Sequence, residues 1–150
     1  AISRTKDKEE TAKSLGAKGL LASSDEKEMQ QHANAFDVII NTVPVKHDVT
    51  PYVPLLDVDG TLVMVGQVGP LNEITTVPMI FGRRRIAGSL IGGIESTQEV
   101  LDFCAEHNIL PECEMIKMED INNAWDRLAK GDIPHRFVID MTAFKMEEAS

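Results

Sequence analysis

The sequence predicts an α/β fold in which helices cover a parallel β-sheet. Two segments in the first half of the chain, residues 36–43 and 60–66, are rich in β-branched residues and almost continuously apolar, as in strands that are covered on both faces. Segments with helical patterns alternate with such strands along the chain, which is typical of a parallel sheet. With 150 residues, the chain is about one domain long.

Capping residues, prolines and glycines delimit the elements of the first half. Thr5 is the expected N-cap of one helix and Gly16 its stop, and Ser24-Asp25 opens the next. Pro51 precedes a short helix, and the last strand ends in two glycines. In chain order we expect a strand end at residues 1–3, helices at 5–15 and 24–32, a strand at 36–43, a helix at 53–57, a strand at 60–66, a helix at 79–82 and a strand at 86–91.

The second half contains the two clearest amphipathic helices. The first covers residues 96–108, with its limit marked by Pro111, and the second covers residues 119–130. The second helix has apolar residues at the spacing i, i+3, i+4, i+7 and i+8, namely Ile121, Ala124, Trp125, Leu128 and Ala129. Trp125 is therefore assigned to the core. Strands are expected at residues 112–118 and 136–141.

Composition excludes several classes of protein. Hydrophobic residues at 43% and charged residues at 26% are those of an ordinary globular chain. The net charge of -9 would repel a polyphosphate backbone, which argues against binding to nucleic acid. No apolar run reaches the ~20 residues that cross a bilayer, and the N-terminus lacks the pattern of a signal peptide, so we expect a cytoplasmic protein.

Parallel sheets of this kind bind ligands at the carboxyl ends of their strands. The segment that follows the opening strand contains Ser3, Arg4, Thr5 and Lys8, two hydroxyls and two cations. If residues 1–3 are the second strand of a dinucleotide-binding fold, these four side chains form a pocket for a 2′-phosphate, and the cofactor is NADP(H). The alternative is a solvated helix start with ordinary surface charges.

Glycines follow two later strands, at residues 66 and 92–93, where a backbone could approach a flat ligand closely. Glycines are also common turn residues after strands. The glycine-rich turn that characterises dinucleotide binding does not occur in these residues. Either the interpretation is wrong, or that turn lies upstream of Ala1.

Other constellations give weaker indications. Cys104, His107 and Cys113 have no evident fourth partner, so we expect no metal site in the chain. The remaining histidines have no neighbours that would form a hydrolase triad. Arg83, Arg84 and Arg85 could contact a phosphate, although such a run is more often a solvated junction between a helix and a strand.

Collinear stretches of the chain resemble the C-terminal part of zinc-dependent alcohol dehydrogenases. They include FDVIINTV at 36–43 and GTLVMVG at 60–66, together with residues 13–17, 86–93, 97–107 and 136–140. The nearest branch is the NADP-dependent cinnamyl alcohol dehydrogenase group of the medium-chain dehydrogenase/reductase superfamily, which includes bacterial aldehyde reductases. No single motif is specific, but the resemblance covers nearly the whole chain in one order.

The resemblance implies a set of cofactor contacts. It assigns the 2′-phosphate to the cluster of hydroxyls and cations at residues 3–8, where Arg4 departs from the hydroxyl residue of most relatives but adds positive charge that should preserve the preference for NADP(H). It assigns the rest of the cofactor to Thr42 and Val43, Gly66 and Gln67, Ser89, Leu90 and Ile91, and to Arg136 near the cofactor phosphates. It implies neither a catalytic residue nor a metal ligand within the chain.

The resemblance also implies what lies outside these residues. Relatives have an N-terminal catalytic domain with ligands for a catalytic zinc, a structural zinc lobe and the glycine-rich turn. The expected fold is therefore a partial Rossmann-type doubly wound parallel sheet, without its first strand, at residues 1–110. Residues 111–150 would return to pack on the catalytic domain, and the strand at 86–91 would pair across the axis of a homodimer.

In the intact enzyme, zinc would polarise the oxygen of an aldehyde or primary alcohol while hydride passes to or from NADP(H). This chain would position the cofactor and would be inactive alone. The alternatives are a stand-alone nucleotide-binding regulatory module and part of a zinc-free quinone reductase. The sequence upstream of Ala1 would separate them, since cysteine-rich zinc motifs there support the alcohol dehydrogenase.

Overall fold

A computed structural model describes residues 1–71, 73–130 and 136–142. The chain divides into two compact units, Ala1–Ile91 and Gly92–Ser150. Each unit is considered by itself. Among the described residues, no helix is both long and apolar enough to cross a membrane.

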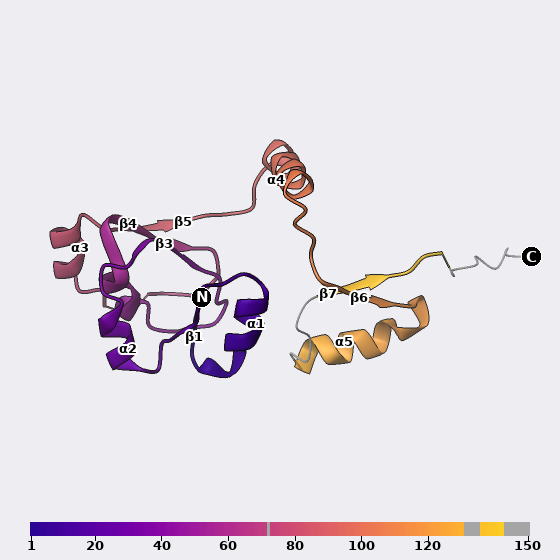
Figure 1. Ribbon diagram of the computed structural model, residues 1–150, viewed down its shortest axis with the longest axis horizontal. Coiled ribbons are helices and arrows are strands. Elements are labelled where there is room, and N and C mark those ends of the chain that lie inside the picture. Colours follow the sequence, from indigo (N-terminus) through magenta and orange to yellow (C-terminus); the bar gives the residue numbers. More distant parts are fainter. Residues whose placement is uncertain (72, 131–135, 143–150) are drawn as a thin grey trace, which may run out of the picture. The chain divides into compact units, whose positions relative to one another are not determined.

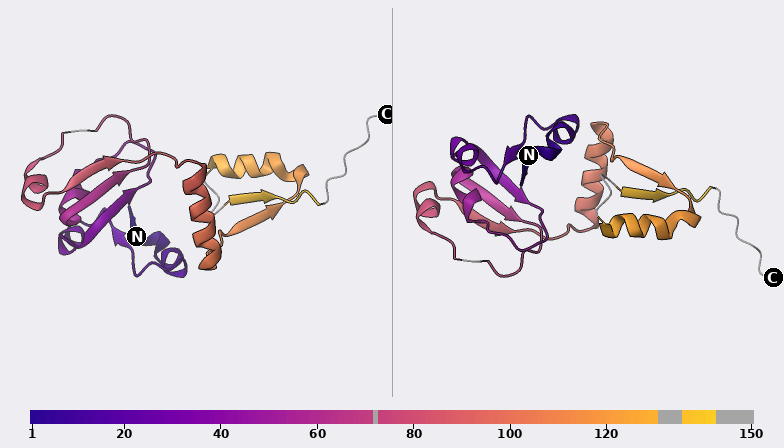
Figure 2. Two further views of the ribbon diagram at one scale, coloured as in Figure 1. Left: turned by 90° about the horizontal axis from the view of Figure 1, so that it is seen from above. Right: turned by 90° about the horizontal axis from the view of Figure 1, so that it is seen from below.

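The first unit is built from parallel strands with helices between them (Figure 1). Strand β1 pairs with β2, and β3, β4 and β5 form a second sheet in that order. Figure 2 shows β3, β4 and β5 side by side and pointing the same way. The predicted α/β class with parallel strands is therefore confirmed. The elements are β1 (Ile2–Ser3), η1 (Lys6–Lys8), α1 (Glu9–Ser14), β2 (Leu21–Ala22), α2 (Glu26–Gln31), β3 (Phe36–Asn41), η2 (Thr50–Leu55), β4 (Leu56–Met64), α3 (Val77–Gly82) and β5 (Arg85–Gly88).

One face of the sheet β3–β4–β5 carries the core of this unit. Ile39 and Leu62, which are neighbours across β3 and β4, pack with Met29 of α2 and Leu55 of η2. On the opposite face, Val38 and Ile40 of β3 are 55% and 63% exposed. The prediction that this strand is covered on both faces is therefore not met by the described residues.

Local structure differs from the predictions at three points. Thr5 precedes η1, but its side chain accepts no capping bond, and its hydroxyl donates to the Asp7 carboxylate. The expected helix at 53–57 is the 3₁₀ segment η2, and the chain continues directly into β4. Strand β2 was not predicted, since two residues are too short for a periodic signal.

Strand β5 ends at Gly88, three residues before the predicted end at Ile91. Its partner β4 ends at Met64, opposite Gly88. The Ser89 N–H still donates to the Met64 carbonyl at 3.0 Å, and this is the last ladder contact between the two strands. Beyond Met64 the chain turns toward β3, so residues 89–91 have no neighbouring strand on that side.

The second unit contains α4 (Ile94–Glu106), β6 (Cys113–Ile116), η3 (Met118–Asp120), α5 (Ile121–Lys130) and β7 (Arg136–Ile139). Strands β6 and β7 are parallel, and the Glu114 carboxylate binds both terminal nitrogens of Arg127 on α5, at 2.6 and 2.9 Å. The Arg127 guanidinium also lies over the ring of Phe137, 4.9 Å from its centroid. The predicted helical period is present, but Trp125 is 62% exposed, because two strands are too narrow to bury the whole apolar face.

The predicted domain boundary near residue 110 remains a prediction. In the structure the chain divides between Ile91 and Gly92, so α4 belongs to the second unit.

Candidate cofactor site

The carboxyl ends of β3 and β4 meet at Gly66. The Asn41 carbonyl accepts hydrogen bonds from the N–H groups of both Val65 and Gly66, each at 3.0 Å. A Cβ atom on Gly66 would lie 2.4 Å from the Val43 carbonyl oxygen and 2.9 Å from the Thr42 carbonyl carbon. Only glycine allows this approach, and it brings the predicted segments 42–43 and 66–67 together.

The third predicted segment follows β5 at the same edge of the sheet. The register Asn41–Met64–Gly88 aligns the last residues of the three strands. Ser89, Leu90 and Ile91 come next, and the side chains of Leu90 and Ile91 are each 89% exposed. Three of the predicted site segments therefore share the carboxyl edge of one sheet, with apolar side chains open to a ligand.

The cluster of hydroxyls and cations follows β1, again at a carboxyl end. The Ser3 and Arg4 carbonyls accept from the N–H groups of Ser23 and Ser24, at 2.8 and 3.3 Å, which extends the pairing with β2. The side chains of Arg4 and Lys8 are exposed and make no hydrogen bond or ion pair with any described residue. Thr5 donates to Asp7 at 2.7 Å. The two cations are thus available to an anion.

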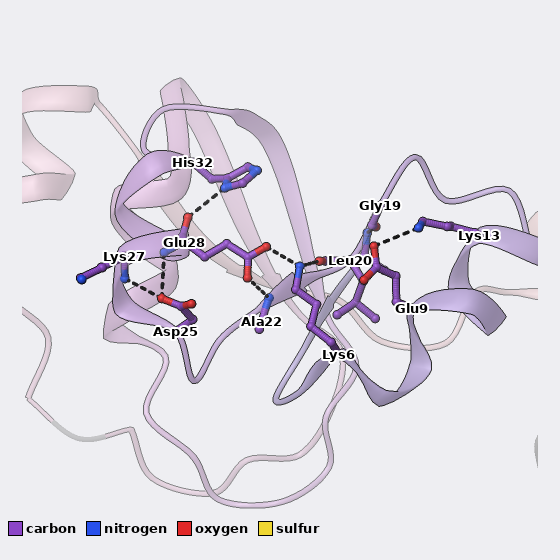
Figure 3. Close-up of polar contacts among 11 residues, drawn as sticks. Lys6, Glu9, Lys13, Gly19, Leu20, Ala22, Asp25, Lys27, Glu28 and His32 are labelled. Atoms are coloured by element: carbon purple, nitrogen blue, oxygen red, sulfur yellow. Dashed lines mark hydrogen bonds and ion pairs between the residues drawn. The ribbon is translucent and has the colours of Figure 1, made fainter.

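Lys6 lies among these residues but is already engaged (Figure 3). Its ammonium group donates to the Leu20 carbonyl and pairs with the Glu28 carboxylate on α2. Glu28 also accepts from the Ala22 N–H at 3.2 Å. The hydrogen bond from Lys6 is the main cause of the lowered pKa of Glu28. Lys6 therefore connects β2 to α2.

The side chains of Asn41 and His47 lie at this edge but were not among the residues assigned to the cofactor. Asn41 is the last residue of β3 and is 8% exposed, and its side chain contacts both the Val43 N–H and the ring of His47. A buried polar residue at a strand end was the available signal, but the apolar run around Asn41 led to its assignment as part of the strand.

The three arginines of the run at residues 83–85 all bind other residues of the first unit. Arg83 and Arg85 pair with Asp59, and Arg84 donates to the Pro78 carbonyl at 3.0 Å and to the Asn34 side chain. Arg85 begins β5, so these residues lie at the amino edge of the sheet, opposite the candidate site. Of the two interpretations of the run, the junction between a helix and a strand is the one observed.

Arg136 is the first residue of β7 and is exposed. It belongs to the second unit, and its predicted contact with the cofactor phosphates remains a prediction. Among the described residues, no three side chains of His, Cys, Asp or Glu gather in a way that could hold a metal ion.

In the first unit, parallel strands end at a glycine-only approach and exposed apolar residues in the sheet β3–β4–β5, and at available cations in the pair β1–β2. Parallel α/β folds with ligand sites at the carboxyl ends of their strands are typical of nucleotide-binding domains. Comparison with known sequences defines the family. The profile of the zinc-binding dehydrogenase family matches residues 1–106, and the chain belongs to this family.

Known proteins agree with this assignment. The chain is 44% identical over 145 residues to a probable cinnamyl alcohol dehydrogenase of Pinus taeda, covering 97% of this chain and 41% of that protein. It is 45% identical over 141 residues to the aldehyde reductase YahK of Escherichia coli, covering 93% and 40%. It thus spans about two fifths of the length of these relatives.

Solved structures show the same similarity. A cinnamyl alcohol dehydrogenase from Sorghum bicolor superposes with a TM-score of 0.84 at 38% identity, covering 99% of this chain and 42% of that one. A cinnamyl alcohol dehydrogenase from Helicobacter pylori, solved in complex with NADP(H), has a TM-score of 0.72 at 36% identity and covers 96% and 41%. The resemblance inferred from the sequence to this group of alcohol dehydrogenases is confirmed.

Proposed function

We propose that this chain is the cofactor-binding part of an NADP(H)-dependent alcohol dehydrogenase or aldehyde reductase. The observation that carries the proposal is the close approach at Gly66, which joins the segments after β3 and β4 into one open edge beside the residues that follow β5. The relative from Helicobacter pylori, solved with NADP(H), supports the choice of ligand.

The donors at the end of β1 fit the 2′-phosphate of NADP(H). Arg4 and Lys8 supply positive charge without a competing partner among the described residues, and Ser3 supplies a hydroxyl. A guanidinium can donate two hydrogen bonds to one phosphate, which makes Arg4 the strongest single contributor. Thr5 would exchange its bond to Asp7 for one to the phosphate.

The edge formed by β3, β4 and β5 fits the flat, uncharged parts of the cofactor. Thr42 and Val43 would lie beside the adenine ribose and the nicotinamide end, and Gly66 and Gln67 would offer backbone groups near the nicotinamide ribose. Residues 89–91 would line the carboxamide. Arg136 would contact the phosphates. When bound, NADP(H) supplies the hydride that is exchanged with the substrate.

Zinc, which the family name implies, does not fit the described residues, because they provide no cluster of three suitable ligands. We therefore assign no step through zinc to this chain. In the proposal, the zinc ligands and most of the site for the aldehyde or primary alcohol lie outside the 150 residues, so the chain alone would not turn over substrate.

The proposal includes a cytoplasmic location and a homodimer. In the structure β5 pairs with β4 only, so its other side is an edge among the described residues, and the exposed Leu90 and Ile91 follow it. An unpaired edge with adjacent apolar side chains suits pairing with a second copy of the strand.

Titration of the intact protein with NADPH and with NADH, followed by cofactor fluorescence, tests the proposal. We expect tighter binding of NADPH, because Arg4 and Lys8 can contact only the cofactor that has a 2′-phosphate. Equal affinities would refute the assignment of the phosphate pocket, and absence of binding by either cofactor would refute the function.

A further inference from the structure

We propose that His47 is a positioning residue that acts through Asn41: it holds the backbone of Thr42 and Val43 in the shape the cofactor needs, and it does so only as the neutral imidazole with its proton on Nδ1. The inference rests on the proposed function, since it concerns the segment assigned to the ribose and nicotinamide.

Asn41 connects the two strand ends that form the site. Its carbonyl accepts from the N–H groups of Val65 and Gly66, both at 3.0 Å. Its side-chain Oδ1 accepts from the Val43 N–H at 3.1 Å, and its Nδ2 lies 2.9 Å from Nε2 of His47. Any rotation of the Asn41 side chain would therefore alter the turn that begins at Thr42.

The donors and acceptors fix the protonation of His47. Because the Val43 N–H can only donate, the Asn41 oxygen must face it, and the Asn41 amide nitrogen must face His47. Nε2 of His47 must then be the acceptor. Nδ1 of His47 lies 2.8 Å from the Val45 carbonyl, which can only accept, so Nδ1 carries the proton. Every group in this chain of hydrogen bonds is satisfied in that one tautomer.

Few other titratable groups lie near the His47 ring. His47 and Asn41 line a cavity of about 80 Å³, in which Tyr52 of η2 is the only other titratable residue among those described. The Tyr52 ring meets the imidazole edge-on, with centroids 6.2 Å apart. Lys46 and Asp48 flank His47 in the loop and are exposed, and the Asp48 carboxylate accepts from the Thr50 N–H. None of these carboxylates or phenols accepts from Nε2.

Protonation would break this arrangement. A proton on Nε2 would point at the Asn41 NH₂ group, so two donors would face each other. Turning the Asn41 amide over would satisfy the imidazolium but would set its NH₂ against the Val43 N–H. Either way one partly buried hydrogen bond is lost next to the cofactor segment, so the neutral form is required for tight binding.

The test uses the intact protein with three variants and measures the dissociation constant of NADPH between about pH 5 and pH 8, the range in which histidines change charge. His47→Gln keeps an acceptor toward Asn41 but cannot be protonated. Asn41→Asp replaces the amide by a carboxylate that accepts from both Val43 and an imidazolium. His32→Gln is the matched control, because the His32 ring bonds to the Glu28 carbonyl and stacks on the Phe36 ring, away from the site.

The 2′-phosphate of the cofactor also titrates in this range, so the informative quantity is the ratio of each variant to the wild type at the same pH. We expect the wild type to lose roughly three- to tenfold more affinity than His47→Gln between the two ends of the range, as for the loss of one hydrogen bond. The affinity of Asn41→Asp for NADPH, divided by that of the wild type at the same pH, should be highest at the acidic end of the range. His32→Gln should follow the wild type.

Parallel pH profiles for the wild type, His47→Gln and Asn41→Asp would overturn the inference. The ¹⁵N chemical shifts of the His47 ring provide a second measurement: we expect the Nδ1–H tautomer near neutral pH. If NADPH does not bind to the wild type, the proposed function fails and the inference fails with it. A shift pattern of the other tautomer would overturn the positioning role alone, with cofactor binding intact.

Discussion

At Gly66 there is room for only a hydrogen atom in the position of a side chain. The Val43 carbonyl oxygen would lie 2.4 Å from a Cβ atom there. The nearest atoms all belong to the backbone of Thr42 and Val43, which cannot rotate away as a side chain can. This close approach brings the backbone of two strand ends into one surface. The shape of this surface thus depends on the absence of a side chain at residue 66.

Replacing Gly66 by alanine should separate the two strand ends. We expect Gly66→Ala to lower the free energy of unfolding by about 1–3 kcal/mol, the usual cost of overpacking, and to weaken NADPH binding. Gly19→Ala is the control, because a Cβ atom on Gly19 meets nothing within 4 Å. Urea denaturation and cofactor titration of both variants measure the effect, and identical behaviour of the two would contradict the packing argument.

Arg4 decides cofactor choice in this account. Arg4→Asp should weaken NADP(H) relative to NAD(H) by about 1–3 kcal/mol, because a charge-assisted hydrogen bond is replaced by repulsion. Lys18→Asp is the control, because it makes the same change of charge at an exposed position that precedes β2 and so lies near the amino end of that strand. The ratio of kcat/KM with the two cofactors is the measurement. A ratio that moves equally in both variants would show that only net charge matters.

At the scale of elements, the short strands β1 and β2 depend on contacts from neighbouring helices. Glu28 of α2 accepts from the Ala22 N–H and pairs with Lys6, so one carboxylate connects α2, β2 and η1 (Figure 3). The pKa of Glu28 is lowered, first by the Lys6 hydrogen bond. The ionised form is therefore the one that stabilises the fold.

This linkage predicts the sign of a pH effect. Because the pKa is lower in the folded state, the contribution of Glu28 is complete well above its ordinary value of 4.5 and is lost as pH falls through the folded-state value. Glu28→Gln should thus be less stable than the wild type at pH 7, and the difference should shrink in acid. Glu26→Gln on the same helix is the control. Urea denaturation from pH 7 to pH 3 tests this, and a difference that grows in acid would contradict it.

The periodic elements were the ones that the sequence could predict. The central strands have long apolar, β-branched runs and the helices of the second unit have a helical period, and the predicted positions agree with the structure to within a few residues. Strand β2 has two residues and depends on pairing with β1, a contact between distant segments that no local pattern reveals. The end of β5 depends in the same way on where β4 stops.

The candidate site was predictable only as positions after strands. That rule pointed to the cluster at residues 3–8, and the family resemblance added the segments at 42–43, 66–67 and 89–91. Neither revealed the contact between Asn41 and His47, because no local sequence pattern shows the course of the loop that joins the two residues. Nor could either show that Lys6 is paired while Arg4 and Lys8 have no described partner, since that depends on the position of α2.

At the scale of the whole molecule, the strand order of the first unit has one position to fill. In the doubly wound order 3-2-1-4-5-6, β2 and β1 correspond to the third and second strands, and β3, β4 and β5 to the fourth, fifth and sixth. The first strand of that order falls between β1 and β3, where the two sheets are not hydrogen-bonded to each other. The proposed phosphate donors after β1 and the edge after β3 thus lie on either side of the position at which folds with this strand order bind the pyrophosphate.

A crystal structure of the intact protein with NADP⁺ bound tests the central claim most directly. We predict that the 2′-phosphate lies within hydrogen-bonding distance of Arg4 and Ser3, and that the nicotinamide ribose lies against Gly66. A cofactor bound at the amino edge of the sheet beside Arg83–Arg85, or with its 2′-phosphate away from the end of β1, would contradict the account.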